Sequence, residues 1–184
     1  MWKMQRAALP PLFRYTRSYQ DPRGKQSGLQ KTDGTAQKDG IAVKIRKMQF
    51  SDMPELARLY YQFWREPSDV GAMERQFRRL EKTDNHILLC AEQDSCLVGS
   101  VMGIICEDLY GNCCPFMVLE NMIVDKSCRQ SGIGKALLGA LEKQAKERRC
   151  TQIILVTEEN RKDACRFYET NGFQADNAGY KKKL

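Results

Sequence analysis

A strand pattern, a short polar loop with two glycines and an amphipathic helix pattern follow one another between residues 118 and 141. Gly132 and Gly134 open the helical part, whose apolar residues share one face: Ile133, Leu137, Leu138 and Leu141. A helix that starts on glycines exposes unpaired backbone N–H groups at the positive end of its dipole. This arrangement predicts a site for a phosphate or pyrophosphate group, flanked by the cations of Arg129 and Lys135.

Two common phosphate-binding patterns do not fit this segment. A P-loop requires a glycine five positions before its Gly-Lys pair, where this chain has Arg129, and a Ser or Thr after the pair, where it has Ala136. The dinucleotide fingerprint requires a third glycine where this chain has Leu137. What remains is R-x-x-G-x-G between a strand and a helix. Taken alone, that pattern still allows an ordinary helix start that binds no ligand.

The periodicity of the remaining chain predicts one α/β domain of the α+β type, with a mixed sheet, from residue 41 to the C-terminus. Strands are expected at 42–48, 86–92, 96–106, 115–124 and 152–157, the last one buried, with one or two more within 173–184. Helices are expected from Asp52 to Pro67, with a capping box to Glu55, and at 69–82, 132–149 and 161–170. A strand–helix–strand unit over residues 115–157 predicts local parallel pairing in an otherwise antiparallel sheet.

Residues 1–40 hold most of the chain's positive charge. They contain eight Lys or Arg and three Asp, which accounts for +5 of the total formal charge of +7. Their composition predicts a basic, disordered extension that cannot bury enough apolar surface to fold. Residues 1–20 contain no acid, which fits either a mitochondrial-type presequence or an extension without a targeting role. No nucleic-acid partner is expected, because the basic segment lacks a recognisable binding scaffold.

The eight cysteines include no C-x-x-C pair, and His86 is the single histidine. The sequence therefore predicts no metal site, and it favours reduced thiols in a cytoplasmic protein over a secreted disulfide framework. No apolar run approaches the roughly 18 to 20 residues of a membrane helix, so no membrane partner is expected.

Two separated segments resemble the GCN5-related N-acetyltransferase (GNAT) family. Residues 129–137, RQSGIGKAL, are similar to its coenzyme A pyrophosphate motif, and residues 164–173, ACRFYETNGF, to its A-x-x-F-Y-x-x-x-G-F segment. The resemblance covers about residues 41–184. It implies a GNAT-like fold, with helices on both faces of a mostly antiparallel sheet, and a parallel strand pair that splays apart at the coenzyme. It also implies acetyl transfer from acetyl-CoA, as co-substrate and without a metal, to an amine in a ternary complex.

The resemblance also implies roles for individual residues. The backbone of Met122, Ile123 and Val124 would bind the pantetheine arm and the acetyl carbonyl. The pyrophosphate would be held by a run of amides with a neighbouring cation, comprising Arg129, Gln130, Ser131, Gly132, Ile133, Gly134 and Lys135. Tyr168 would protonate the departing thiolate, which a phenol can do once negative charge develops on the sulfur. Many members have Asn where this chain has Arg161, so Asn160, one residue earlier, becomes the candidate coenzyme contact.

Glu120 is the candidate general base, because a flanking apolar environment would raise the pKa of its carboxyl group. A solvent-facing strand residue is the equal alternative, and Glu107 and Asp108 are weaker candidates. We expect a small-molecule amine as acceptor. The aromatic residues of the first helix, among them Tyr60 and Phe63, are expected either to contact it or to belong to the core. Acetylation of protein N-termini or lysines, a non-catalytic CoA-binding regulatory module and a homodimer remain open.

Overall fold

The computed structural model describes residues 36–38 and 41–184. The predicted extension over residues 1–40 lies largely outside these described residues. The described residues all belong to one of the chain's two units, and its sheet has the strand order β1-β2-β3-β4-β5-β6. The strands are β1 (Ala36–Lys38), β2 (Ile41–Lys47), β3 (His86–Gln93), β4 (Cys96–Cys106), β5 (Phe116–Val124) and β6 (Ile153–Ile154). Neighbours are antiparallel except β5 and β6, so the predicted mixed sheet with one parallel pair is confirmed.

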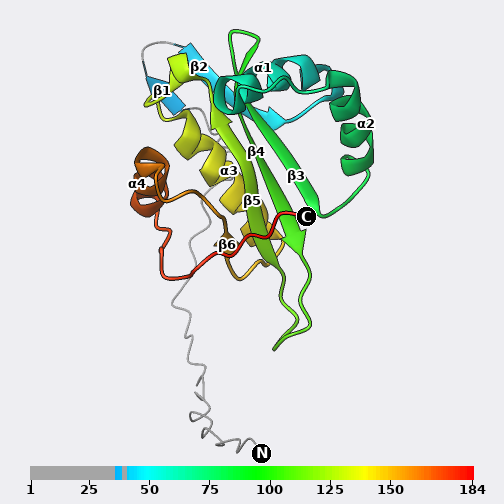
Figure 1. Ribbon diagram of the computed structural model, residues 1–184, viewed down its shortest axis with the longest axis vertical. Coiled ribbons are helices and arrows are strands. Elements are labelled where there is room, and N and C mark those ends of the chain that lie inside the picture. Colours follow the sequence, from blue (N-terminus) through cyan, green and yellow to red (C-terminus); the bar gives the residue numbers. More distant parts are fainter. Residues whose placement is uncertain (1–35, 39–40) are drawn as a thin grey trace, which may run out of the picture. The chain divides into compact units, whose positions relative to one another are not determined.

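Helices cover both faces of this sheet (Figure 1). They are α1 (Met53–Trp64), α2 (Val70–Leu80), α3 (Ile133–Glu147) and α4 (Lys162–Thr170), with short 3₁₀ turns at Phe50–Asp52 and Lys126–Cys128. Successive side chains of β3 point to opposite faces of the sheet and pack against different helices. Leu89 packs in the cluster under α3, whereas the next residue, Cys90, packs against Leu59 of α1.

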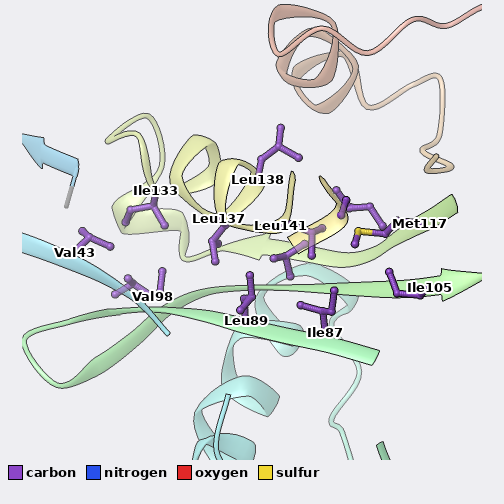
Figure 2. Close-up of a cluster of buried hydrophobic side chains, with 14 residues drawn as sticks. Val43, Ile87, Leu89, Val98, Ile105, Met117, Ile133, Leu137, Leu138 and Leu141 are labelled. Carbon is purple, nitrogen blue, oxygen red and sulfur yellow. The ribbon is translucent and has the colours of Figure 1, made fainter. Parts of the chain in front are cut away.

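The largest apolar cluster lies between α3 and the strands. Leu137 and Leu141 point from α3 toward residues such as Val98 and Leu89 (Figure 2), and both leucines are fully buried. Gly103 of β4 lets this helix approach closely, because an added Cβ would lie 2.7 Å from the Leu141 side chain. The helix that carries the predicted phosphate-binding start is therefore fixed to the sheet by its apolar face.

A β-bulge interrupts β5 at Asn121. Met102 of β4 pairs with Glu120, and Ser100 pairs with Ile123, so β5 has one residue more than β4 in this interval. Asn121 takes up the extra residue with a left-handed φ of 52°, a conformation that Asn tolerates better than most residues. Before the bulge, the odd-numbered residues Met117 and Leu119 face α3. After it, the even-numbered residues Met122 and Val124 do so.

Three local predictions were wrong. The described chain has no strand within residues 173–184, and the predicted buried strand at 152–157 shortens to β6, with Ile154 and Val156 exposed. β6 lies at the edge of the described sheet, so after it Leu155 still packs against the core while Val156, on the other face, is left exposed. Glu55 does not close a capping box, because its carboxylate accepts from Arg58 at 3.0 Å. Instead Gln49 and Asp52 form the box, one turn earlier.

Among the described residues, every helix falls short of the length and apolar character that crossing a bilayer requires. All eight cysteines are free thiols.

Candidate active site

A pocket of about 940 Å³ lies beside the second half of β5. It extends along the loop after β5, the start of α3 and one side of α4. Ten of the residues predicted to form the site line it: Met122, Ile123, Val124, Arg129, Gln130, Gly132, Gly134, Lys135, Asn160 and Tyr168. Ser131, Ile133 and Glu120 are not part of this lining. The structure therefore brings both motifs to one cavity, although 26 residues separate them in the sequence.

The pocket is present because β5 and β6 part after two residues. Met117 pairs with Ile153 and Val118 with Ile154, and the paired residues of β6 end there. Beyond this point, β5 keeps its pairing with β4 through Val124. The bulge at Asn121 turns Met122 and Val124 toward the α3 side, where Met117 and Leu119 point in the first half of the strand. Among the described strands, this part of β5 thus has no strand partner on the β6 side, and the Val124 carbonyl accepts from the Arg129 side chain at 3.3 Å.

The loop before α3 uses two left-handed residues to present backbone N–H groups. Gln130 has φ 64° and Gly132 has φ 89°, and Ser131 donates its hydroxyl hydrogen to the carbonyl of Cys128 at 2.6 Å. Gly132 caps α3 without a side-chain bond, and the first intrahelical bond runs from Ala136 to the Gly132 carbonyl at 3.0 Å. The N–H groups before Ala136 therefore have no partner within the helix and can bind an anion.

Gly134 joins the two motifs physically. A Cβ at this position would lie 3.3 Å from two ring atoms of Phe167 and 3.6 Å from the Met122 methyl. The glycine therefore lets α4 pack against the first turn of α3, in addition to opening that turn toward a ligand. Ile133, the residue between the two glycines, is buried in the core and fixes the helix start from below.

Asp125 anchors the loop that leaves β5. Its carboxylate accepts from Arg58 at 2.7 Å and from Gln62 at 2.9 Å, both on α1, and from the amide and hydroxyl of Ser127. Burial alone would raise the pKa of Asp125, but these donors hold it well below its usual range. The loop is thereby fixed to α1 on one side while α3 begins on the other.

Tyr168 lies between two aromatic rings at the strand end of the pocket. Its ring meets Phe167 at 5.3 Å and Phe173 at 5.5 Å between centroids, and its hydroxyl donates to the sulfur of Met122 at 3.9 Å. Gly172, at φ 90°, turns the chain so that Phe173 returns to Tyr168. Burial raises the pKa of the phenol, the Glu120 charge adds to this, and the Arg161 charge opposes it. Tyr168 is therefore held protonated.

Glu120 has an exposed side chain, so the burial expected around its carboxyl group is absent. It lies two residues before Met122, and its negative charge helps to raise the pKa of Tyr168, after burial as the main cause. The other two candidate acids lie at the opposite end of β4 and do not line the pocket. Glu107 is exposed there, and Asp108 accepts from the amide of Tyr110.

Phe63 and Arg161 also line the pocket, and of the two only Arg161 had no predicted role there. Phe63, expected to contact the acceptor or belong to the core, is 37% exposed. The Arg161 guanidinium lies 4.3 Å from the centre of its ring, a cation–π contact between the start of α4 and the end of α1. The departure from Asn at position 161 was the one signal that could have drawn attention to this residue.

Positive charge dominates the lining. Five basic residues face one acid, Asp163, and the five are Arg129, Lys135, Arg161, Lys162 and Arg166. Such a surface suits a ligand with several phosphates. In the part of the chain that the structure describes, no three His, Cys, Asp or Glu side chains converge as metal ligands would.

Comparison with known proteins supports the same class. A model of the Acetyltransferase (GNAT) family matches residues 53–173, and the chain therefore belongs to this family, as its two motifs predicted. It is 36% identical over 76 residues to the uncharacterized protein YdhI of Bacillus subtilis, covering 41% of this chain and less than half, 44%, of that relative. It is 24% identical over 143 residues to the uncharacterized N-acetyltransferase YhfO of the same organism, covering 73% of this chain and 91% of YhfO.

Among solved structures, the chain resembles a transcriptional regulator from Bacillus halodurans with a TM-score of 0.72 and 28% identity. That match covers 77% of this chain and 99% of the other. The fold and the family membership together define an acyltransferase of the GNAT class.

Proposed function

We propose that the protein transfers an acetyl group from acetyl-CoA to a primary amine of a small molecule, by direct attack in a ternary complex. The observation that carries this proposal is the continuity of one pocket. It runs from the open N–H groups at the start of α3, past the part of β5 beyond its pairing with β6, to the phenol of Tyr168.

The phosphate end of the pocket fits coenzyme A. Unpaired first-turn N–H groups bind phosphate oxygens without any side chain, and Arg129 and Lys135 lie beside them. Lys162 and Arg166 of α4 add positive charge along the adjoining wall. Glycine at 132 is required here because few other residues adopt its φ of 89°.

The other end of the pocket fits a thioester undergoing attack. Backbone N–H groups of residues 122–124 are the proposed donors for the oxygen that becomes negatively charged as the amine adds to the carbonyl carbon. Tyr168 is the proposed acid for the leaving sulfur, since a buried phenol keeps its proton until a strong base appears nearby.

Glu120 is the proposed acceptor of the amine proton, either directly or through water. Its solvent exposure suits relay through water, because the side chain lies outside the pocket lining but only two residues before Met122, which lines it.

The test is an assay of free thiol release from acetyl-CoA with a panel of small amines, alongside calorimetry of coenzyme binding. The proposal predicts saturable, amine-dependent thiol release and an N-acetylated product by mass spectrometry. Coenzyme binding without turnover on any amine would instead indicate a non-catalytic CoA-binding module. Absence of coenzyme binding would refute the function altogether. A peptide with a free N-terminus and a lysine belongs in the same panel, because its preferential acetylation would replace the small-molecule acceptor.

A further inference from the structure

The N-terminal end of α4 is held less firmly than its C-terminal half. In that half, Phe167 packs against the start of α3, and the Tyr168 hydroxyl donates to Met122. No side chain of α4 is fully buried, and in the described chain residues 161–166 make no side-chain hydrogen bond or ion pair to another helix or strand. Residues 155–161, which lead into α4, form no helix or strand. The N-terminal end can therefore move while the other half stays packed.

A single side-chain contact bridges this end of α4 to α1. The Arg161 guanidinium lies 4.3 Å from the centre of the Phe63 ring, and both residues line the pocket. Phe63 lies in the last turn of α1, where the Gln62 side chain donates to Asp125 at 2.9 Å and accepts from the amide of Lys126 at 3.0 Å. Phe63 is thus on a fixed element, and Arg161 is the partner that can move.

This contact is weak enough to open during ligand binding. Arg161 and Lys162 place two cations at the N-terminal end of α4, where the helix dipole disfavours positive charge. The Phe63 ring offsets this effect, and a cation–π contact near the surface changes an equilibrium by about two- to fivefold. The pocket has a volume of about 940 Å³ while the contact is made, so a ligand can occupy it without separating the two side chains.

We propose that Arg161 and Phe63 form a latch across the coenzyme pocket, which opens for the coenzyme to enter or leave and is closed in both the free and the bound protein. This inference rests on the proposed binding of acetyl-CoA and concerns its rates. α4 also carries Tyr168 and forms one wall of the pocket, so the closed latch keeps that wall in place. The two side chains are thus positioning residues, which set how long the coenzyme stays bound.

A latch has a kinetic signature that a direct ligand contact lacks. The latch contact exists in the free and the bound protein but not while the ligand passes. Its loss therefore accelerates entry and exit alike and leaves the affinity unchanged. The loss of a contact to the bound ligand accelerates exit alone.

The test measures both rates by stopped flow with a fluorescent acetyl-CoA analogue, and the affinity for acetyl-CoA itself by calorimetry. Phe63→Leu removes the ring and leaves the charge of the pocket unchanged. Both rates should rise about two- to fivefold, while the dissociation constant stays within about twofold of wild type. Arg161→Gln should raise the exit rate by the same factor, and the double variant should release the analogue no faster than either single variant. Phe63→Tyr keeps the aromatic face and should behave like wild type.

Tyr61→Leu is the matched control. It removes an aromatic ring from the same turn of α1, at an exposed position outside the pocket lining, and should leave both rates as in wild type. Circular dichroism checks that each variant keeps its fold. Should Phe63→Leu fail to fold, Arg161→Gln still tests the exit rate, because position 161 is exposed.

Three results would overturn the latch while leaving the proposed function intact. These are wild-type rates in Phe63→Leu, a faster exit with an unchanged entry rate, and additive effects in the double variant. The second result would place Phe63 in contact with the bound coenzyme instead. If calorimetry shows no binding of acetyl-CoA to the wild-type protein, the proposed function itself fails, and the latch fails with it.

Discussion

The two halves of β5 have the same neighbour on one side and different surroundings on the other. Before the bulge, Met117 is fully buried and its backbone pairs with β6. After it, Met122 and Val124 line the pocket, where β6 no longer follows. One strand thus provides core packing first and a ligand-binding wall afterwards. The extra residue at Asn121 and the early end of β6 create the difference.

Deletion of Asn121 tests this comparison most severely. Removing the extra residue restores regular alternation, so Met122 and Val124 would turn away from α3 and the pocket wall would be lost. We expect acetyl-CoA affinity to fall about 100-fold or more, a loss of at least ~2.7 kcal/mol. Calorimetry measures the affinity, and circular dichroism checks that the protein folds. Asn121→Gly keeps the bulge and its left-handed φ, and it should bind like wild type. Equal coenzyme affinity in the deletion variant would show that the bulge does not shape the pocket.

Replacement of the Tyr168 phenol tests whether the residues at the pocket half of β5 take part in the reaction. Tyr168→Phe keeps both ring contacts and removes the proton, so kcat should fall about 100-fold or more while acetyl-CoA affinity stays the same. Steady-state kinetics with calorimetry separates the two effects. Phe173→Leu is a matched control that disturbs the same aromatic group without touching the hydroxyl. An unchanged kcat in Tyr168→Phe would remove the phenol from the mechanism.

A pair of alanine substitutions compares the two halves directly. Met117→Ala removes a fully buried side chain and should lower the free energy of unfolding by about 2–5 kcal/mol, with little change in coenzyme affinity. Met122→Ala, at a half-buried pocket position, should cost less stability and more affinity. Urea unfolding and calorimetry on both variants provide the comparison. If the two substitutions had the same profile, the division of the strand into a core half and a pocket half would be wrong.

Replacement of Asp125 gives the smallest of the expected effects, a loss of stability that depends on pH. Because its pKa is depressed in the folded protein, the stability that its carboxylate contributes is complete above the ordinary pKa of about 4. That contribution is lost as the pH falls through the lower, folded-state value. Asp125→Asn should therefore be less stable than wild type at pH 7, by about 1.5–3 kcal/mol for hydrogen bonds to a charged group. Below pH 4 the gap should narrow, and a gap independent of pH would contradict the charge-based anchor.

Much of the domain could be predicted from periodicity and turn residues. The hairpin of β3 and β4 and the helices α2 and α3 lie within a few residues of their predicted positions, because alternation and helical stripes report burial directly. Prediction failed at the end of the chain. Residues 173–184 form no strand, and Val156, which reads as a strand residue, is 80% exposed because β6 stops before it. A local pattern does not reveal whether a neighbouring strand is present.

In the candidate site, too, the local motifs could be predicted from the sequence, whereas the contacts between distant residues could not. The glycines at 132 and 134 and the Phe167–Tyr168 pair were visible in the sequence. The contact of Phe167 with Gly134 was not, because it joins positions more than thirty residues apart. The bulge did leave a sign in the sequence, because the two residues Glu120 and Asn121 interrupt the alternation of apolar and polar residues along the strand. For Phe63 the sequence left two positions open, in the core or at the acceptor, and only the folding of α1 against the sheet shows that it lines the pocket.

The most direct test of the central claim is to follow the acetyl group itself. Acetyl-CoA with a deuterated acetyl group is incubated with the protein and an amine acceptor, and the products are analysed by mass spectrometry. We predict that the labelled acetyl group appears on the amine nitrogen in step with free coenzyme A, and far more slowly with Tyr168→Phe. Label that stays in the thioester, or that appears as free acetate whether or not the amine is present, would contradict acetyl transfer at this pocket.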